Sequence, residues 1–300
     1  MIKRAILIII TISSWCFAIE NGHPVGDSEE IARTTVTVNL MFVGGGYFPP
    51  VVPDPSRLLV CTGTIIDSDL VLTAAHCVKS YSAFHIIFGT HPGQAGVQKR
   101  SVRAFEVPLT YHYTGQTEET RFSDLALLYF NGGLPEGFQK ANLSLEEIST
   151  SNALDHDLRA AGVGPCEDSR CTLTEAMGIR GSKVFLPDDL SVVFNGKAFP
   201  TKGDSGGPLF WTSPTGNRIL GVCHGNVNVD GQGEELYTQV SHFSEWIKDA
   251  SVRLRSTGLS RGPGWDVEEG GQRRIDVPCP DTVCPALVQV PTQGASPPVK

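Results

Sequence analysis

Between residues 34 and 250 the chain consists mainly of short apolar segments that turn-forming residues interrupt at close intervals. Thr35–Val38 alternates polar and apolar residues, as a strand with one buried face does. Other segments of strand length are Leu58–Cys61, Thr64–Ile66, Leu70–Leu72, Phe84–Phe88, Leu125–Phe130 and Arg218–Cys223. The 32 glycines and 20 prolines supply turns and disfavour long helices. The pattern predicts an all-β chain of barrels or sandwiches rather than alternating strands and helices.

One helix is expected over residues 241–252, where one face carries Phe243, Ile247 and Ala250. Beyond this helix the composition shifts to glycine, proline and charged residues. Residues 256–300 are therefore predicted to form an extended, Gly/Pro-rich C-terminal tail.

The first eighteen residues have the pattern of a cleaved signal peptide. Lys3 and Arg4 form a basic start, Ala5–Ile12 is apolar except for Thr11, and Ala18 ends a suitable cleavage site. The apolar run is too short to span a bilayer, and no later segment is long and apolar enough to do so. We expect residues 1–18 to be removed and the protein to be secreted or periplasmic, a location that suits its cysteines.

The charge balance argues against nucleic acid as a partner. The chain has 24 basic and 32 acidic residues, a formal net charge of −8, and no run of lysine and arginine that could neutralise phosphates. With 40% hydrophobic residues, the chain has enough apolar surface for a sizeable core.

Three short segments carry residues suited to nucleophilic catalysis. In chain order they are Thr73-Ala74-Ala75-His76-Cys77, Ser123-Asp124-Leu125-Ala126-Leu127-Leu128 and Gly203-Asp204-Ser205-Gly206-Gly207-Pro208. Each has an ordinary structural explanation when taken alone. Their joint occurrence in this order makes coincidence a poor explanation and indicates one catalytic site.

In these segments the chain resembles the trypsin/chymotrypsin-like serine proteases, and the similarity extends over about residues 19–250. The resemblance implies two antiparallel six-stranded β-barrels with the catalytic site between them. The first barrel would occupy about residues 30–135 and the second about 136–240, within a protease domain of residues 19–255.

The resemblance also assigns roles that suit the chemistry of the side chains. A serine hydroxyl is a poor nucleophile at neutral pH, so Ser205 needs His76 as a base, and Asp124 would favour and orient the imidazolium. The backbone amides of Gly203 and Ser205 would form the oxyanion hole.

The segment Gly203–Gly207 also fits the G-x-S-x-G turn of α/β-hydrolases, and Asp230 and His242 follow in that family's order. That turn requires a helix directly after the serine. Here Gly206-Gly207-Pro208 precedes an apolar segment of strand type, so this alternative is disfavoured.

Two further features follow from the resemblance. A Cys61–Cys77 disulfide would clamp the loop that carries His76. The sequence from Ile19 onward is similar to the mature N-terminus of the family, which implies that a new α-amine at Ile19 pairs with Asp204, although Glu20 departs from the usual apolar residue.

The residues expected around the substrate pocket depart from the family pattern. Phe199 stands where trypsins have an aspartate, Glu235 where a pocket-wall glycine is typical, and Cys223-His224-Gly225 where Ser-Trp-Gly is usual. These matches place His224 near the triad aspartate. Two specificities stay open: an apolar or small side chain in a shallow pocket, or a basic side chain that reaches Glu235.

The remaining cysteines form two pairs with the same spacing, Cys166 with Cys171 and Cys279 with Cys284. Two local disulfides are expected, and neither pair has the companion ligands that a metal site needs. Cys223 is then the odd thiol, expected to be buried and inert.

The sequence thus predicts a secreted serine endopeptidase that acts through an acyl-enzyme and needs no cofactor or metal. Its expected partners are peptide or protein substrates and, as a candidate, a protein inhibitor. Because the pocket is altered, the alternative is a non-catalytic homologue that acts as a binding or regulatory module.

Overall fold

The computed structural model describes residues 19–41, 57–58, 60–79, 83–113, 121–145, 158–167, 171–186, 189–193, 198–213, 216–229 and 232–262. The predicted signal peptide and the tail from residue 263 lie outside the described residues, as does the predicted Cys279–Cys284 pair.

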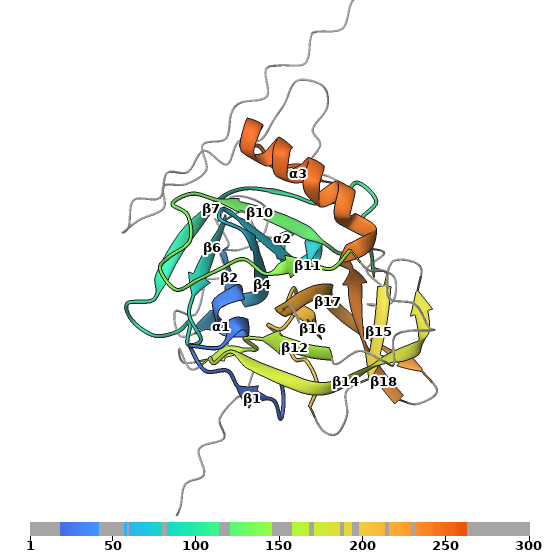
Figure 1. Ribbon diagram of the computed structural model, residues 1–300. Coiled ribbons are helices and arrows are strands. Elements are labelled where there is room, and N and C mark those ends of the chain that lie inside the picture. Colours follow the sequence, from blue (N-terminus) through green and yellow to red (C-terminus); the bar gives the residue numbers. More distant parts are fainter. Residues whose placement is uncertain are drawn as a thin grey trace, which may run out of the picture.

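Six antiparallel strands close into the first barrel in the order β10–β5–β4–β2–β6–β7 (Figure 1). The strands are β2 (Thr35–Met41), β4 (Val60–Asp67), β5 (Leu70–Thr73), β6 (Ala83–Phe88), β7 (Gln98–Glu106) and β10 (Ala126–Phe130). Apolar side chains fill the barrel, among them Val38, Ile65, Leu72, Ile86, Phe105 and Leu127, each less than 2% exposed. The burial of these aliphatic and aromatic residues stabilises the closed sheet.

The second sheet also closes on itself. Its path runs β14–β12–β16–β17–β18–β15, and β15 pairs again with β14. The strands are β12 (Leu158–Gly162), β14 (Thr174–Leu186), β15 (Asp189–Val193), β16 (Pro208–Ser213), β17 (Gly216–Val229) and β18 (Gln232–Gln239). Two shorter strands extend it: β1 (His23–Pro24) pairs with β14, and β11 (Asn142–Leu143) pairs with β17. The prediction of two six-stranded antiparallel barrels is confirmed.

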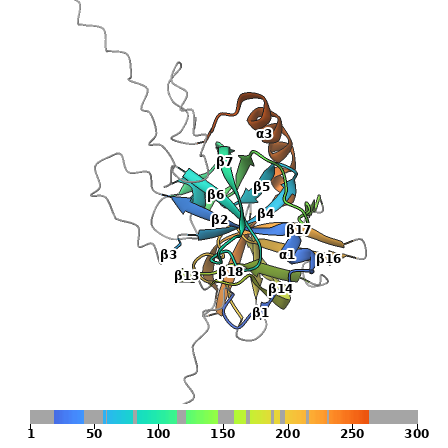
Figure 2. The same ribbon diagram turned by 90° about the vertical axis from the view of Figure 1, so that its left-hand side faces the viewer.

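Several small elements lie outside the two barrels. Figure 2 shows the short strands β3 (Arg57–Leu58) and β13 (Cys166–Glu167), which pair across the two halves of the chain. Two more short strands, β8 (His112–Tyr113) and β9 (Arg121–Phe122), pair with each other. Before the C-terminal helix there are two short helices, α1 (Glu30–Thr34) and α2 (Ala75–Lys79).

The predicted C-terminal helix is present but begins and ends later than expected. Residues 240–243 form a 3₁₀ turn, η3 (Val240–Phe243), and the α-helix α3 spans Ser244–Thr257. The apolar face continues to Leu254, which is fully buried, so the helix extends beyond residue 252. Gly258 ends it in the left-handed conformation (φ 63°) and donates its amide to the Leu254 carbonyl. Within the described residues, no helix is long and apolar enough to span a membrane.

The chain after α3 returns to the first barrel, so residues 256–262 are folded where a tail was predicted. The Arg261 amide donates to the Phe105 carbonyl (3.0 Å), and the Val107 amide donates to the Arg261 carbonyl (2.9 Å). The Ser260 hydroxyl accepts from the Phe105 amide (3.1 Å). This segment, residues 258–262, occupies the edge of β7 that β6 leaves uncovered, because β6 pairs with β7 only as far as Ser101.

We expect a chain that ends at Thr257 to be less stable than one that ends at Gly262. The shorter chain loses the helix cap and three hydrogen bonds, each of which contributes about 1 kcal/mol, so the free energy of unfolding should fall by about 2–4 kcal/mol. Urea unfolding of both chains beside the full-length protein measures the difference. Equal midpoints for the two truncations would show that the docked segment does not contribute to stability.

Candidate active site

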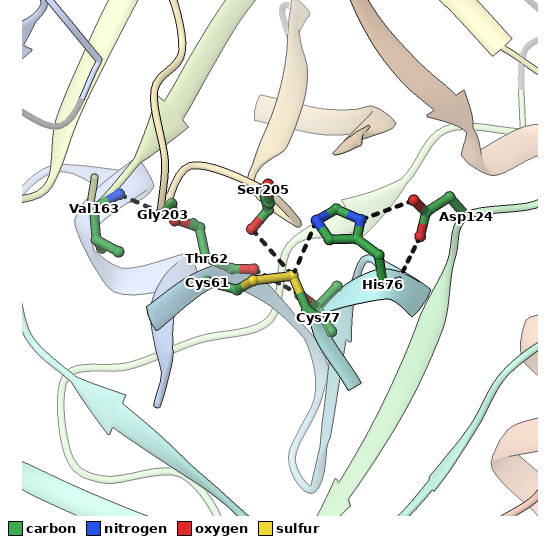
Figure 3. Close-up of a disulfide and its surroundings, with 9 residues drawn as sticks. Cys61, Thr62, His76, Cys77, Asp124, Val163, Gly203 and Ser205 are labelled. Carbon is green, nitrogen blue, oxygen red and sulfur yellow. Dashed lines mark hydrogen bonds and ion pairs between the residues drawn. A yellow bond between two sulfur atoms is a disulfide. The ribbon is translucent and has the colours of Figure 1, made fainter. Parts of the chain in front are cut away.

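The three candidate catalytic residues come from different elements that meet between the barrels (Figure 3). His76 lies on α2, directly after β5, and Asp124 lies just before β10, so both belong to the first barrel. Ser205 lies on the loop that leads into β16 of the second barrel.

The His76–Asp124 pair is fully formed. The Asp124 Oδ2 atom lies 2.8 Å from Nδ1 of the His76 ring, and the Asp124 Oδ1 atom accepts the His76 backbone amide at 2.9 Å. Asp124 is completely buried, while the His76 side chain is 20% exposed. Burial opposes ionisation of Asp124, but the His76 ring, the nearby His224 and the backbone amide together hold its pKa below the usual range. The aspartate therefore stays ionised and orients the ring.

Ser205 lies next to the His76 ring, on the side away from Asp124 (Figure 3). The Ser205 carbonyl oxygen and His76 Nε2 both approach Cys77 Sγ, at 3.8 Å and 3.7 Å. Within the described residues, the Ser205 hydroxyl makes no hydrogen bond to the ring. Such bonds are often long without substrate and tighten when substrate binds.

Thr62 fastens the loop that carries Ser205 to the first barrel. Its hydroxyl donates to the Gly203 carbonyl (2.9 Å) and accepts from the Val163 amide (3.0 Å), while its own amide donates to the Ser205 carbonyl (2.8 Å). No sequence motif marks Thr62 as a site residue. Its only signal is its place next to Cys61, because its partners lie more than 100 residues away.

The backbone around Ser205 is closely packed, and only some of its amides are hydrogen-bonded. Gly203 has a φ of +100°, and a Cβ there would lie 2.2 Å from the Gly164 carbonyl oxygen, so only glycine fits. The Asp204 and Gly206 amides are both engaged in hydrogen bonds. In the described part of the chain, the amides of Gly203 and Ser205 donate to no group, which is what an oxyanion hole requires.

The predicted Cys61–Cys77 disulfide is present, with an S–S distance of 2.02 Å. Donor atoms of Cys61, Cys77 and His76 all lie within 4.8 Å of one another. Because the two sulfurs are joined to each other, they are not thiolates and cannot serve as the ligands of a zinc site.

Asp204 is buried among amides. It accepts hydrogen bonds from the Gly164 amide (2.8 Å) and from the amide (2.7 Å) and hydroxyl (3.2 Å) of Thr201. Burial raises its pKa to about 7, although these donors oppose the shift. A cation beside the Asp204 carboxyl group would lower its pKa and so favour the ionised form.

Ile19 lies in the core of the second barrel. It is 1% exposed, and its backbone nitrogen donates to Thr174 Oγ1 at 2.8 Å. Gly162 faces Thr174 across the β12–β14 pair, and a Cβ on Gly162 would lie 2.1 Å from Asp204 Oδ1. The Ile19 nitrogen and the Asp204 carboxylate therefore approach the same cross-strand pair, and the predicted ion pair between them stays a prediction.

The pocket residues occupy different environments. Phe199 is 43% exposed, and its backbone forms a two-way bridge with Glu20. His224 and Gly225 lie on β17, where His224 is 1% exposed. Glu235 lies half-buried on β18 opposite Asn226, in the middle of the same strand pair. Their roles in a substrate pocket stay predictions.

The other cysteines agree with the expected pattern as far as the described residues go. Cys223 is outside any disulfide and carries a buried thiol, as predicted. Cys171 takes part in a disulfide, and its predicted pairing with Cys166 stays a prediction.

The chain after Ser205 enters strand β16 and not a helix, which excludes the α/β-hydrolase turn considered above. His242 lies in η3, and Asp230 lies outside the described residues.

Comparison with known proteins agrees with this arrangement. A family model described as Trypsin matches residues 49–247. The chain is 26% identical over 216 residues to Trypsin epsilon of Drosophila erecta, covering 63% of this chain and 76% of the relative. It is 25% identical over 222 residues to Venom serine protease of Polistes dominula, covering 66% and 78% of the two chains. It is also 25% identical over 218 residues to Glandular kallikrein-10 of Rattus norvegicus, covering 63% and 80%.

Proposed function

Because the chain belongs to the trypsin family, we propose that it is a secreted serine endopeptidase that hydrolyses peptide bonds through an acyl-enzyme. The observation that carries the proposal is the buried Asp124 carboxylate, bonded at 2.8 Å to a His76 ring whose other side faces Ser205. Export is proposed from the basic and apolar leader at residues 1–18.

The reaction follows from the order of these groups. His76 Nε2 takes the proton of the Ser205 hydroxyl while the Ser205 oxygen attacks the scissile carbonyl carbon. The proton then passes from His76 to the leaving amine as the C–N bond breaks, which leaves an ester on Ser205. In the second half of the reaction, His76 takes a proton from a water molecule, which attacks the ester carbon. The proton then returns to the Ser205 oxygen as the C–O bond breaks, and the carboxylic acid product leaves. Asp124 stabilises the imidazolium at each stage without taking its proton.

Negative charge forms on the substrate oxygen during both attacks. The Gly203 and Ser205 amides would donate to that oxygen, and the loss of one such donor typically lowers the rate by about 10²–10³. Thr62 contributes indirectly, because its hydroxyl fixes the carbonyl of Gly203.

Labelling with a fluorophosphonate tests the function directly. We expect the purified mature protein to be labelled once, at Ser205, and to cleave sites in a mixed peptide library. A folded mature protein that neither reacts with the probe nor cleaves peptides would support the alternative, a non-catalytic homologue. Such a homologue keeps the fold of the family without its activity.

Glu235 is proposed to select a basic residue before the scissile bond. Burial, the neighbouring Cys223 and the Glu235 charge raise the pKa of the Tyr237 phenol, and Glu235 shares a face of β18 with Tyr237. Tyr237 packs in the second-barrel core with Cys223, whose backbone is hydrogen-bonded to Gly206 and Gly207 of the Ser205 loop. A lysine or arginine side chain entering between the barrels would find its countercharge there.

We expect Glu235→Gln to lower kcat/KM for substrates with arginine or lysine before the cut by about 10–100-fold, since a charge-assisted hydrogen bond contributes about 1.5–3 kcal/mol. Its neighbour Glu234 alternates to the other side of β18, so Glu234→Gln is the matched control. Cleavage profiles of both variants measure the effect. Arginine cleavage that survives Glu235→Gln, or a profile without basic residues, would contradict the assignment.

A further inference from the structure

One face of the strand pair β2–β4 carries four buried threonines. Thr35 lies opposite Thr64 and Thr37 lies opposite Thr62, so the four side chains share one face of the sheet. Each of them is at most 1% exposed. Within the described residues, the hydroxyls of Thr35, Thr37 and Thr64 make no hydrogen bond. Thr62 is therefore the member of this set whose hydroxyl is bonded to groups outside its own sheet.

The two bonds of the Thr62 hydroxyl can run in one direction only (Figure 3). The hydroxyl has a single proton, which it donates to the Gly203 carbonyl at 2.9 Å, and its oxygen accepts the Val163 amide at 3.0 Å. A β-branched side chain has few rotamers, and the Thr62 carbonyl is itself held by the Thr73 hydroxyl at 2.7 Å. The Thr62 hydroxyl is therefore a fixed point on the first barrel.

Thr62 holds both of the residues whose amides would bind the oxyanion. Its hydroxyl holds the Gly203 carbonyl, and its own amide donates to the Ser205 carbonyl at 2.8 Å. In the part of the chain that the structure describes, the amides of Gly203 and Ser205 donate to no group. One residue of the first barrel thus helps to set the spacing between these two free amides.

Gly203 needs such an external contact because glycine restricts its own backbone least. A Cβ on Gly203 would lie 2.2 Å from the Gly164 carbonyl oxygen, so this close approach excludes any side chain. The same absence of a side chain leaves Gly203 free to adopt many backbone conformations. Val163 directly precedes Gly164, so the Thr62 hydroxyl holds the chain on both sides of this contact.

We propose that Thr62 is a positioning residue of the oxyanion hole, whose hydroxyl fixes Gly203 and so aims its amide at the oxygen of the substrate. This inference rests on the proposed protease function. The hydroxyl is buried and has both of its bonds inside the protein, and the His76–Asp124 pair does not involve it. Its loss should therefore leave substrate binding and the base in place, and weaken the stabilisation of a charge that exists only in the transition state.

The test compares Thr62→Val, Thr62→Ser and the matched control Thr37→Val. Valine keeps the shape of threonine without the hydroxyl, and Thr37 is the buried threonine opposite Thr62 whose hydroxyl has no partner among the described residues. We expect Thr62→Val to lower kcat by about 10–100-fold with little change in KM, since a misplacement of about 1 Å can cost on the order of 10²-fold. Thr62→Ser keeps a hydroxyl and should restore most of kcat, and Thr37→Val should leave kcat unchanged.

A pair of inhibitors isolates the oxyanion hole from the rest of the site. With a peptide aldehyde, the Ser205 oxygen bonds to the carbonyl carbon, the C=O bond opens to an oxyanion, and the serine proton passes to His76. The corresponding peptide alcohol binds without a covalent bond. The preference for the aldehyde, measured as the ratio of the two inhibition constants, should fall by about 10–100-fold in Thr62→Val and stay at the wild-type value in Thr37→Val.

The outcomes separate this inference from the function on which it rests. Wild-type protein that is not labelled at Ser205 by a fluorophosphonate would overturn the protease assignment itself. If wild-type is labelled and Thr62→Val keeps both kcat and the preference for the aldehyde, Thr62 has no positioning role. A lower unfolding midpoint with an unchanged preference would make the residue merely structural, and would overturn the inference as well. Should Thr62→Val not fold, Thr62→Cys, whose thiol is a weak donor, takes its place, and an unchanged preference there would count equally against the inference.

Discussion

Ser205→Ala is expected to abolish peptide hydrolysis, with a loss of turnover on the order of 10⁴–10⁶, while the fold is retained. The substitution removes the attacking oxygen but leaves His76 bonded to Asp124, because that pair does not involve the serine. His76→Ala should cost about as much, and the double variant little more, since the residues act as one unit.

The measurement is single-turnover hydrolysis of the best peptide from the library, with circular dichroism as the check on folding. Thr212→Ala, which alters a partly exposed hydroxyl at the far end of β16, is a control on the strand that follows Ser205. Wild-type rates in purified Ser205→Ala would refute the assignment of the nucleophile.

One extra residue before Ile19 is expected to lower activity by about 10²–10³. We propose that the signal peptide ends at Ala18, and that the new Ile19 α-ammonium pairs with the Asp204 carboxylate beside Gly162. Breaking one side of a buried pair costs about 3–5 kcal/mol. Asp204 directly precedes Ser205, so the loss of the pair should displace the Gly203 and Ser205 amides and lower the rate of hydrolysis.

The pH dependence of stability distinguishes the two forms. In the uncut chain the pKa of Asp204 is raised from 3.8 to about 7 by burial, so its contribution to folding is present below about pH 4 and is lost as pH rises through about 7. In the cut chain the proposed ion pair would lower the pKa of Asp204 and raise that of the ammonium above about 8. The stabilising pair then persists at neutral pH and is lost only as pH rises through the raised pKa of the amine.

The experiment uses exported protein whose N-terminus has been sequenced, beside a form extended by one residue. The free energy of unfolding of the cut form should exceed that of the extended form increasingly between pH 4 and pH 7. Asp204→Asn should remove this difference. A mature end other than Ile19, or full activity in the extended form, would refute the hypothesis.

The sequence predicted those parts of the protein that local patterns encode. The family resemblance carried by the three segments around His76, Asp124 and Ser205 implied two barrels with a site between them, and the short apolar segments form strands. The Cys61–Cys77 disulfide followed from the family resemblance. The spacing of apolar residues located the last helix but not its end, because Leu254 extends the buried face by one turn.

What the sequence did not predict depends on contacts between distant segments. Thr62 looks like an ordinary strand residue until the fold brings Gly203 and Val163 to its hydroxyl. The register of β17 with β18 shifts at His224, and no local pattern specifies such a shift. Arg261 bonds to the end of β7 that β6 does not reach, and where β6 stops is fixed by the register of the closed barrel.

Because Thr62 of the first barrel holds the loop that carries Ser205, the position of Ser205 depends on contact between the two barrels. One hydroxyl holds groups from both the loop before Ser205 and the strand end at Val163, so a partial separation of the barrels would release the nucleophile before either barrel unfolds. Activity in rising urea should therefore disappear ahead of the loss of β-structure, as local opening precedes global unfolding. The proposed activity would then be lost through a separation of the two barrels that probes of β-structure would not detect.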